Sequence, residues 1–166
     1  GLDESAPAEL CAEALRALKV WRNPPRLDLV DGWARRFSPA PVGEVLAPRL
    51  PALLALRDPA LKALALEVMI NHELRPEPAA GSAIVADASA PAELRAQALR
   101  LVLAGKPDDP AAKRSLDAAL REDSPAPLHR VALASLLPSA PDRLVAEART
   151  VLARRTLSEK QHAVAL

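Results

Sequence analysis

The sequence predicts an all-helical protein, and three observations indicate this class: its composition, the spacing of its prolines and an internal repeat. Half of the 166 residues are hydrophobic, and most of these are Ala, Leu and Val. That apolar content is sufficient for one domain with a sizeable core. Aromatic residues make up 2% of the chain and Tyr is absent, whereas β-sandwiches and barrels are usually rich in aromatic and β-branched residues.

Seventeen prolines divide the chain into short segments. Most of them stand between Ala- and Leu-rich runs, where a helix tolerates proline in its first turn or just beyond its end. We therefore expect about nine short helices, separated by these prolines and by other turn residues.

The internal repeat has a period of 33 or 34 residues. Residues 7–15 match residues 91–99 at seven of nine positions. In five segments, Ala stands four residues and Leu five residues after an anchoring position. The leucines of these Ala-Leu pairs are Leu15, Leu66, Leu99, Leu133 and Leu166. The intervals between successive leucines are 51, 33, 34 and 33 residues. A fixed period of this length is typical of helical repeat proteins.

Each repeat is expected to contain two helices. In the first kind of helix, the anchoring residue, the Ala four residues later and the apolar residue eight residues later lie on one face. Second apolar runs stand between these helices, at residues 42–56, 77–86, 110–120 and 141–153. Antiparallel helix pairs repeated in this way predict a right-handed α-solenoid, with the Ala-Leu helices along one of its faces.

Residues 123–137 resemble the second helix of HEAT repeats. The resemblance lies in an Asp and a Pro at the start, an aliphatic residue beside a basic one, and an Ala/Leu run behind them. When the equivalent segments of the other repeats are included, the resemblance covers nearly the whole chain. It implies that residues 1–166 form a single domain, a HEAT-like, armadillo-type superhelix. Tetratricopeptide repeats have a similar period of about 34 residues, but their bulky aromatic positions are absent from these repeats.

Several helix ends are marked by polar residues. Asp123 or Ser124 can cap the free amides of the following helix, with proline in its first turn. Asp58 and Ser89, which also stand shortly before a proline, mark similar starts. His72 is expected at a helix C-terminus, where a cation suits the helix dipole.

Both ends of the chain have the character of boundaries within a longer protein. Gly1 precedes an already helical pattern, and the chain stops directly after an Ala-Leu pair, in the middle of a helical rhythm. We therefore interpret the chain as a domain of a longer protein. A terminal helix pair without a polar cap exposes its apolar face, so we expect Leu152, Val164 and Leu166 to be partly exposed.

A column of basic residues follows the anchoring position. The first repeat has Cys11 there, and the later repeats have Lys62, Arg95, His129 and His162. In HEAT repeats such a residue typically pairs with an acidic or carbonyl group of the neighbouring turn, which fixes the stacking of the repeats, and Asp58 and Asp123 are placed to accept this pairing. A ligand-binding column is the alternative interpretation.

His129 and His162 also raise the question of a metal site. Equivalent positions of adjacent repeats lie within about 10 Å, the usual spacing of packed helices. Tetrahedral zinc needs four ligands, however, and no acidic residue or cysteine recurs in the same column. Cys11 is the single cysteine, so the chain has no Cys-x-x-Cys motif for zinc or covalent haem. We predict that this protein binds no metal and no cofactor.

An insertion at residues 21–38 accounts for the long first interval, and it contains every aromatic residue of the chain. The side chains of interest in it are Trp21, Arg22, Arg26, Trp33, Arg35, Arg36 and Phe37. One interpretation is structural: the aromatic rings anchor a long connection onto the solenoid. The other is a ligand or protein contact, because long insertions often carry function and Trp and Arg dominate interfaces.

The same insertion resembles one found in HEAT segments of very large bacterial secreted proteins. The residues that carry this resemblance are Trp21, Asn23, Pro24, Pro25, Asp28, Val30 and Gly32. In those proteins the HEAT segment lies between a propeller similar to PQQ-dependent sugar dehydrogenases and a cytochrome c-type domain. The resemblance implies an extracytoplasmic parent protein, an oxidoreductase in which this chain is an accessory spacer between redox modules.

The motifs of the chain favour a non-catalytic role. No nucleophile elbow, zinc-protease motif, phosphate loop or dinucleotide fingerprint is present. The 22 Lys and Arg residues are balanced by 21 Asp and Glu residues, which disfavours nucleic acid as a partner. No apolar run approaches the about 18 residues needed to cross a membrane. We therefore expect a scaffold that binds protein or neighbouring domains of the same chain.

Two alternatives stay open at this point. One is the accessory spacer of a PQQ- or haem-linked oxidoreductase, which is implied by the resemblance of the insertion. The other is a HEAT-like nucleic-acid-binding domain, in which Trp33 and either Asp28 or Asp31 would act as in HEAT-like DNA glycosylases.

The structural interpretation of the insertion generates a first prediction. Replacing Trp21 or Trp33 by Ala should lower the free energy of unfolding by about 3–5 kcal/mol, as large aromatic truncations in cores do. Thermal denaturation checks this. If neither substitution changed the melting temperature but both abolished association with a partner domain, the insertion would be an interaction site.

Overall fold

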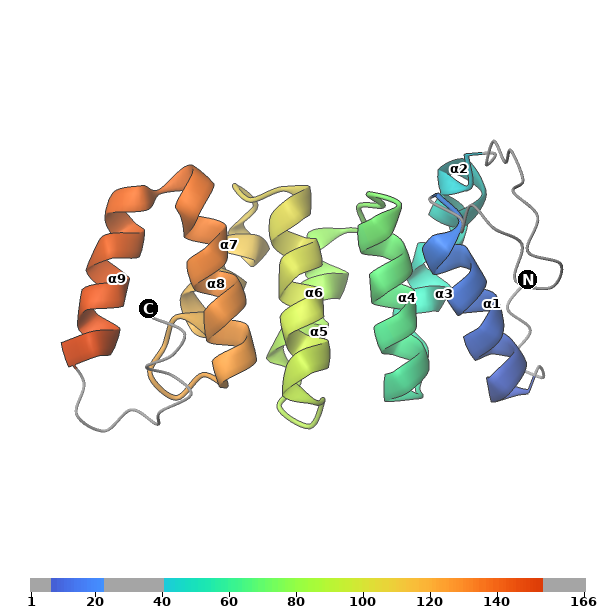
Figure 1. The fold of residues 1–166 in the computed structure, drawn as a ribbon, viewed down its shortest axis with the longest axis horizontal. Coiled ribbons are helices and arrows are strands. Elements are labelled where there is room, and N and C mark those ends of the chain that lie inside the picture. Colours follow the sequence, from blue (N-terminus) through green and yellow to red (C-terminus); the bar gives the residue numbers. More distant parts are fainter. Residues whose placement is uncertain (1–6, 23–40, 154–166) are drawn as a thin grey trace, which may run out of the picture. The chain divides into compact units, whose positions relative to one another are not determined.

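The computed structural model describes residues 7–22 and 41–153, and within these ranges its regular structure is entirely helical (Figure 1). The elements, in chain order, are α1 (Ala8–Val20), α2 (Gly43–Leu46), the short 3-10 helix η1 (Ala47–Arg49), α3 (Leu50–Leu54), α4 (Pro59–Asn71), α5 (Pro78–Ala86), α6 (Ala92–Gly105), α7 (Pro110–Ala119), α8 (Ala126–Ser139) and α9 (Pro141–Ala153). The predicted all-helical class is confirmed, and the described part of the chain contains nine α-helices.

The chain divides into two compact units, with the boundary between Leu74 and Arg75. The first unit contains α1 to α4, and the second contains α5 to α9. The assembly of all helices into one domain and one solenoid stays a prediction.

In the first unit, α4 is the central helix, because both α1 and α3 pack against it. The core between them is built from Leu15 of α1, Leu53 of α3, and Leu66 and Met69 of α4, all of which are almost completely buried. The apolar run at residues 42–56 does not form one helix. Prolines stand in the first turns of η1 and α3, and the missing proline amide interrupts the helical hydrogen bonds there.

In the second unit, the helices form two adjoining pairs, α5 with α6 and α7 with α8. Helix α6 packs beside α8, and α5 packs beside α7, so that helices of the same kind are neighbours (Figure 1). Helix α9 packs against α8. Within this unit, two consecutive repeats therefore stack with α6 and α8 in one layer and α5 and α7 in the other.

A hydrogen bond between repeat-equivalent residues joins α5 to α7. The Ser115 hydroxyl donates to the Ser82 hydroxyl at 3.0 Å, and the Ser82 hydroxyl donates to the Ala111 carbonyl at 3.4 Å. Ser82 and Ser115 are 33 residues apart, which equals the period of the sequence repeat. The repeat in sequence therefore corresponds to a repeat in packing.

The Ala-Leu pairs form the core where another helix covers them. The pairs at 65–66, 98–99 and 132–133 are all buried. Helix α1 differs: Leu15 is buried, whereas Ala14 is exposed and the anchoring Leu10 is 63% exposed. Among the described helices, α1 packs chiefly against α4. The side of α1 that faces away from α4 is therefore not covered by another described helix to the same extent.

The helix caps follow the prediction at one site and depart from it at two. Asp58 caps α4, since its carboxylate accepts from the amides of Ala60 at 2.7 Å and Leu61 at 3.1 Å. At α8, the prediction of Asp123 or Ser124 as the N-cap is wrong, because Pro125 occupies that position; the predicted first-turn proline is present.

At α6, the helix begins where the Ser89 and Pro91 pattern predicts it, but the N-cap is Pro91 and not Ser89. Ser89 instead donates its amide and its hydroxyl to the Asp87 carboxylate. Pro7, Pro91 and Pro125 share an extended N-cap conformation, with φ of −53°, −54° and −56°. The carbonyl of each of these prolines accepts a hydrogen bond at 3.1 Å from the amide four residues later. The proline ring therefore fixes the backbone at the helix start without a side-chain cap.

The contact between α5 and α6 generates a second prediction. Gly81 is buried on α5, and a Cβ atom added there would collide with Cγ2 of Val102 on α6. Gly81→Ala should therefore destabilise the protein by about 1–3 kcal/mol through overpacking, although Ala is the better helix former. Urea denaturation measures the change.

Gly105→Ala is the matched control, because a Cβ atom at the end of α6 meets nothing within 4 Å. Its effect should stay within about 1 kcal/mol, and the sign should be stabilising. Equal destabilisation by both substitutions would show that backbone conformation, and not the α5–α6 contact, requires glycine.

Candidate functional site

Most residues of the predicted insertion site lie outside the described residues. This is true of Arg26, Trp33, Arg35, Arg36 and Phe37, and also of His162 in the basic column. Trp21 and Arg22, in contrast, lie at the end of α1, where Trp21 is the half-buried C-cap and Arg22 is exposed. The choice between a structural and a binding role for the whole insertion therefore stays a prediction.

Arg22 connects the end of α1 to the end of α4. Its Nη1 atom pairs with Oε1 of Glu73 at 2.6 Å and donates to the Asn71 carbonyl at 3.2 Å. Lys19, one turn earlier on α1, pairs with Glu67 of α4 at 2.7 Å. These ion pairs are exposed or only half-buried, and each is therefore worth little on its own.

Donors from the end of α4 also satisfy carbonyl groups at the end of α1. Asn71 Nδ2 donates to the Lys19 carbonyl at 3.2 Å, and His72 Nε2 lies 2.7 Å from the Leu18 carbonyl. Because a carbonyl oxygen only accepts, His72 Nε2 carries the proton in this contact. The last carbonyls of a helix lack partners within the helix. Asn71 supplies a donor to the Lys19 carbonyl, and His72 adds a second donor to the Leu18 carbonyl, which also accepts from the Trp21 amide at 3.2 Å.

The backbone at the end of α4 holds these side chains in place. The Leu74 amide donates to the Met69 carbonyl at 2.9 Å and the Glu73 amide donates to the Ile70 carbonyl at 3.1 Å, which is the Schellman pattern of helix termination. Glu73 has a φ of 55°, in the region that favours glycine. His72 is the C-cap, as predicted for a helix C-terminus. We name the contacts of Asn71, His72 and Glu73 with α1 the helix-end clasp.

The described members of the basic column have different surroundings. Arg95 donates from Nε to the Val85 carbonyl at 2.9 Å, which is the predicted kind of partner at the end of the neighbouring helix α5. His129 is 3% exposed in the core of the second unit, and Lys62 is half-buried on α4. Asp58, an expected partner, caps its own helix. A continuous ladder across all repeats stays a prediction.

A polar hollow in the second unit was not recognised from the sequence. It has a volume of about 560 Å³, and residues from α5, α6, α7 and the start of α8 line it. Its polar lining consists of Ser82, Arg95, Arg114, Ser115, Arg121, Asp123 and Ser124. The 33-residue spacing of Ser82 and Ser115 was the one signal in the sequence that could have indicated it.

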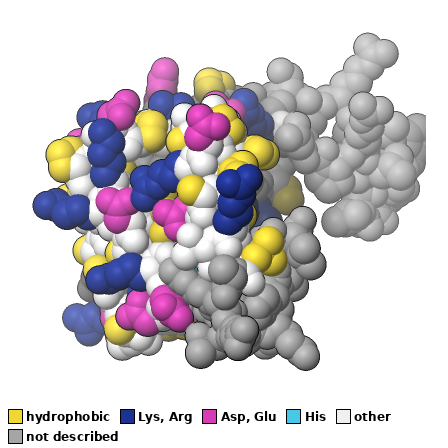
Figure 2. Space-filling view, turned by 90° about the vertical axis from the view of Figure 1, so that its left-hand side faces the viewer, with side chains coloured by type: hydrophobic (Ala, Val, Ile, Leu, Met, Phe, Trp, Pro, Cys, Tyr) yellow, Lys and Arg dark blue, Asp and Glu magenta, His cyan; other side chains and the backbone are white. Residues whose placement is uncertain are grey.

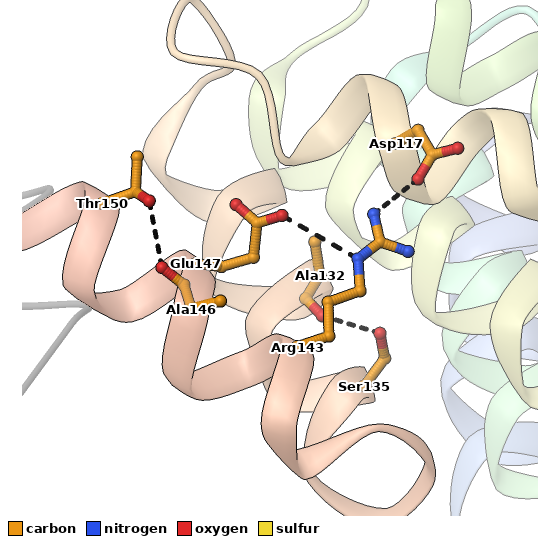
Figure 3. Close-up of polar contacts among 7 residues, drawn as sticks. All are labelled: Asp117, Ala132, Ser135, Arg143, Ala146, Glu147 and Thr150. Atoms are coloured by element: carbon orange, nitrogen blue, oxygen red, sulfur yellow. Dashed lines mark hydrogen bonds and ion pairs between the residues drawn. The ribbon is translucent and has the colours of Figure 1, made fainter.

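The α9 end of the second unit carries a separate group of charges (Figure 3). Arg143 on α9 pairs with Asp117 of α7 at 2.6 Å and approaches Glu147 on its own helix at 3.8 Å. Figure 2 shows this end, where basic, acidic and apolar side chains are intermingled. Leu152 is 49% exposed here, which confirms its predicted exposure, whereas Val164 and Leu166 lie outside the described residues.

The described residues gather no set of three or more His, Cys, Asp or Glu side chains that could hold a metal ion. None of the described helices has both the length and the apolar composition required to cross a bilayer.

The helix-end clasp generates a third prediction. His72→Ala should lower the free energy of unfolding by about 1 kcal/mol, because it removes a half-buried hydrogen bond to the Leu18 carbonyl, which then keeps the Trp21 amide as its donor. Arg22→Ala should cost less than about 1 kcal/mol, because its ion pair with Glu73 is exposed. Urea denaturation of both variants checks the order, and a larger effect of Arg22→Ala would contradict it.

Comparison with protein-family models, with curated proteins and with solved structures finds no match for this chain.

Proposed function

We propose that this chain is a non-catalytic scaffold, in which HEAT-like helix pairs form one right-handed α-solenoid that binds protein or neighbouring domains of the same chain. The observation that carries the proposal is the agreement between the sequence period and the packing of the second unit. Ser82 and Ser115, one period apart, are hydrogen-bonded to each other across the contact between α5 and α7.

The physical reason for a binding role is the architecture of stacked helix pairs. Each pair contacts only its neighbours, and a stack of pairs presents an extended surface made of successive helices. A surface of this kind recognises other polypeptides by shape and by side-chain chemistry, and it needs no reactive group. The nearly balanced charge of the chain, with 22 basic and 21 acidic residues, favours protein over nucleic acid as the partner.

A photo-crosslinking experiment tests the scaffold. A photoreactive amino acid replaces Leu137 on α8 or Val145 on α9, which are exposed apolar residues, in the full-length protein produced in its native organism. We expect a discrete crosslinked product with one protein, or with one neighbouring segment of the same chain, from these helix positions. Mass spectrometry identifies the product and the crosslinked peptide.

Lys106 is the control position, because it is an exposed residue in the connection between α6 and α7 and lies off the helix surface. Crosslinking from Lys106 should be weaker than from either helix position. If the full-length protein accumulates but gives no discrete product from Leu137 or from Val145, the scaffold proposal fails.

A further inference from the structure

The polar hollow of the second unit contains more positive than negative charge. Three guanidinium groups line it, those of Arg95 on α6, Arg114 on α7 and Arg121 just after α7, against the single carboxylate of Asp123. The chain as a whole has a net charge of only +1, so this is a local excess. A site of this composition attracts an anionic group.

The guanidinium groups are available to a ligand. Arg114 and Arg121 are exposed, and neither forms an ion pair or a side-chain hydrogen bond with another residue in the ranges that the structure describes. In contrast, Arg22 and Arg143 are engaged with carboxylates. Arg95 uses Nε to bind the Val85 carbonyl, which orients the group and leaves its two terminal nitrogens for another acceptor.

Ser124 adds a hydroxyl group to the same hollow. The residue is 7% exposed, and its side chain has no hydrogen-bond partner among the described residues, although its backbone amide donates to the Arg121 carbonyl at 3.1 Å. It stands directly before α8, a helix of 14 residues whose N-cap, Pro125, provides no side-chain cap. The positive end of the α8 dipole therefore adjoins the hollow.

We propose that this hollow binds an acidic peptide segment of a partner protein, with Arg95, Arg114 and Arg121 as the residues that recognise its carboxylates. Guanidinium groups bind carboxylates through paired, charge-assisted hydrogen bonds. The volume of about 560 Å³ is within the range of about 300–1,000 Å³ that is usual for binding pockets. The polypeptide class of this partner rests on the proposed function.

The charges favour a peptide over a nucleic acid. A phosphate backbone carries a charge at every nucleotide and requires a long basic track, whereas the excess here consists of three arginines around one hollow, with Asp123 among them. A short acidic segment matches such a compact group of donors. The Ser124 hydroxyl is suited to the amide groups of a peptide main chain, whereas the Ser82 and Ser115 hydroxyl groups already donate within the protein.

Fluorescence anisotropy tests the inference with a labelled peptide of alternating Glu and Gly and a matched peptide of alternating Gln and Gly. The wild-type protein should bind the Glu peptide at least about tenfold more tightly than the Gln peptide, and added salt should weaken the binding. The double variant Arg114→Ala with Arg121→Ala should bind the Glu peptide at least about tenfold more weakly.

The control is the double variant Arg100→Ala with Arg130→Ala, which has the same net charge as the Arg114 and Arg121 double variant. Arg100 on α6 and Arg130 on α8 are exposed and do not line the hollow. It should bind the Glu peptide within about twofold of the wild type. An equal loss in both double variants would mean general electrostatic attraction and would overturn the proposal, as would equal binding of the two peptides. A single-stranded oligonucleotide that binds more tightly than the Glu peptide, through Arg114 and Arg121, would also overturn it.

The two proposals fail in different ways. Crosslinking from Leu137 or Val145 without binding of the Glu peptide would support the scaffold proposal and contradict the proposal that the hollow binds an acidic segment. Binding of the Glu peptide through Arg114 and Arg121 without any crosslinked product would support the acidic-peptide site and contradict the scaffold proposal.

Discussion

The close packing of the Ala-Leu helices is the constraint on which the rest of the structure depends. Ala65, Ala98 and Ala132 are at most 1% exposed, and their small side chains allow neighbouring helices to approach closely. The leucine that follows each of them is at most 5% exposed, and dense packing of this kind is sensitive to a single added methyl group. Gly81 has the same role on α5, where it faces Val102.

Proline defines where these helices begin, and it does so in a way that leaves polar side chains available for other contacts. Pro7, Pro91 and Pro125 are N-caps of equal geometry, and none of these helix starts uses a side-chain hydrogen bond. At α8 this has a consequence for recognition. Ser124 does not cap the helix, so its hydroxyl can take part in the polar hollow.

Two polar arrangements coexist on this helical framework, and they differ in function. In the helix-end clasp, Asn71 and His72 donate to carbonyls of α1 and Arg22 pairs with Glu73, so these groups serve stability. In the hollow, the Arg114 and Arg121 side chains make no such contact with the described residues. Charged groups without such a contact among the described residues are the ones that we propose a partner uses.

The sequence by itself determined the all-helical class, the positions of the apolar runs and the period, because hydrophobic spacing and proline both act locally along the chain. It did not reveal that residues 42–56 form three short helices, that Pro125 replaces Asp123 or Ser124 as the N-cap, or that His72 binds the Leu18 carbonyl. The hollow depended entirely on tertiary structure. Its arginines come from α6, α7 and the segment after α7, and only the packing of these helices brings side chains so separated in sequence around one space.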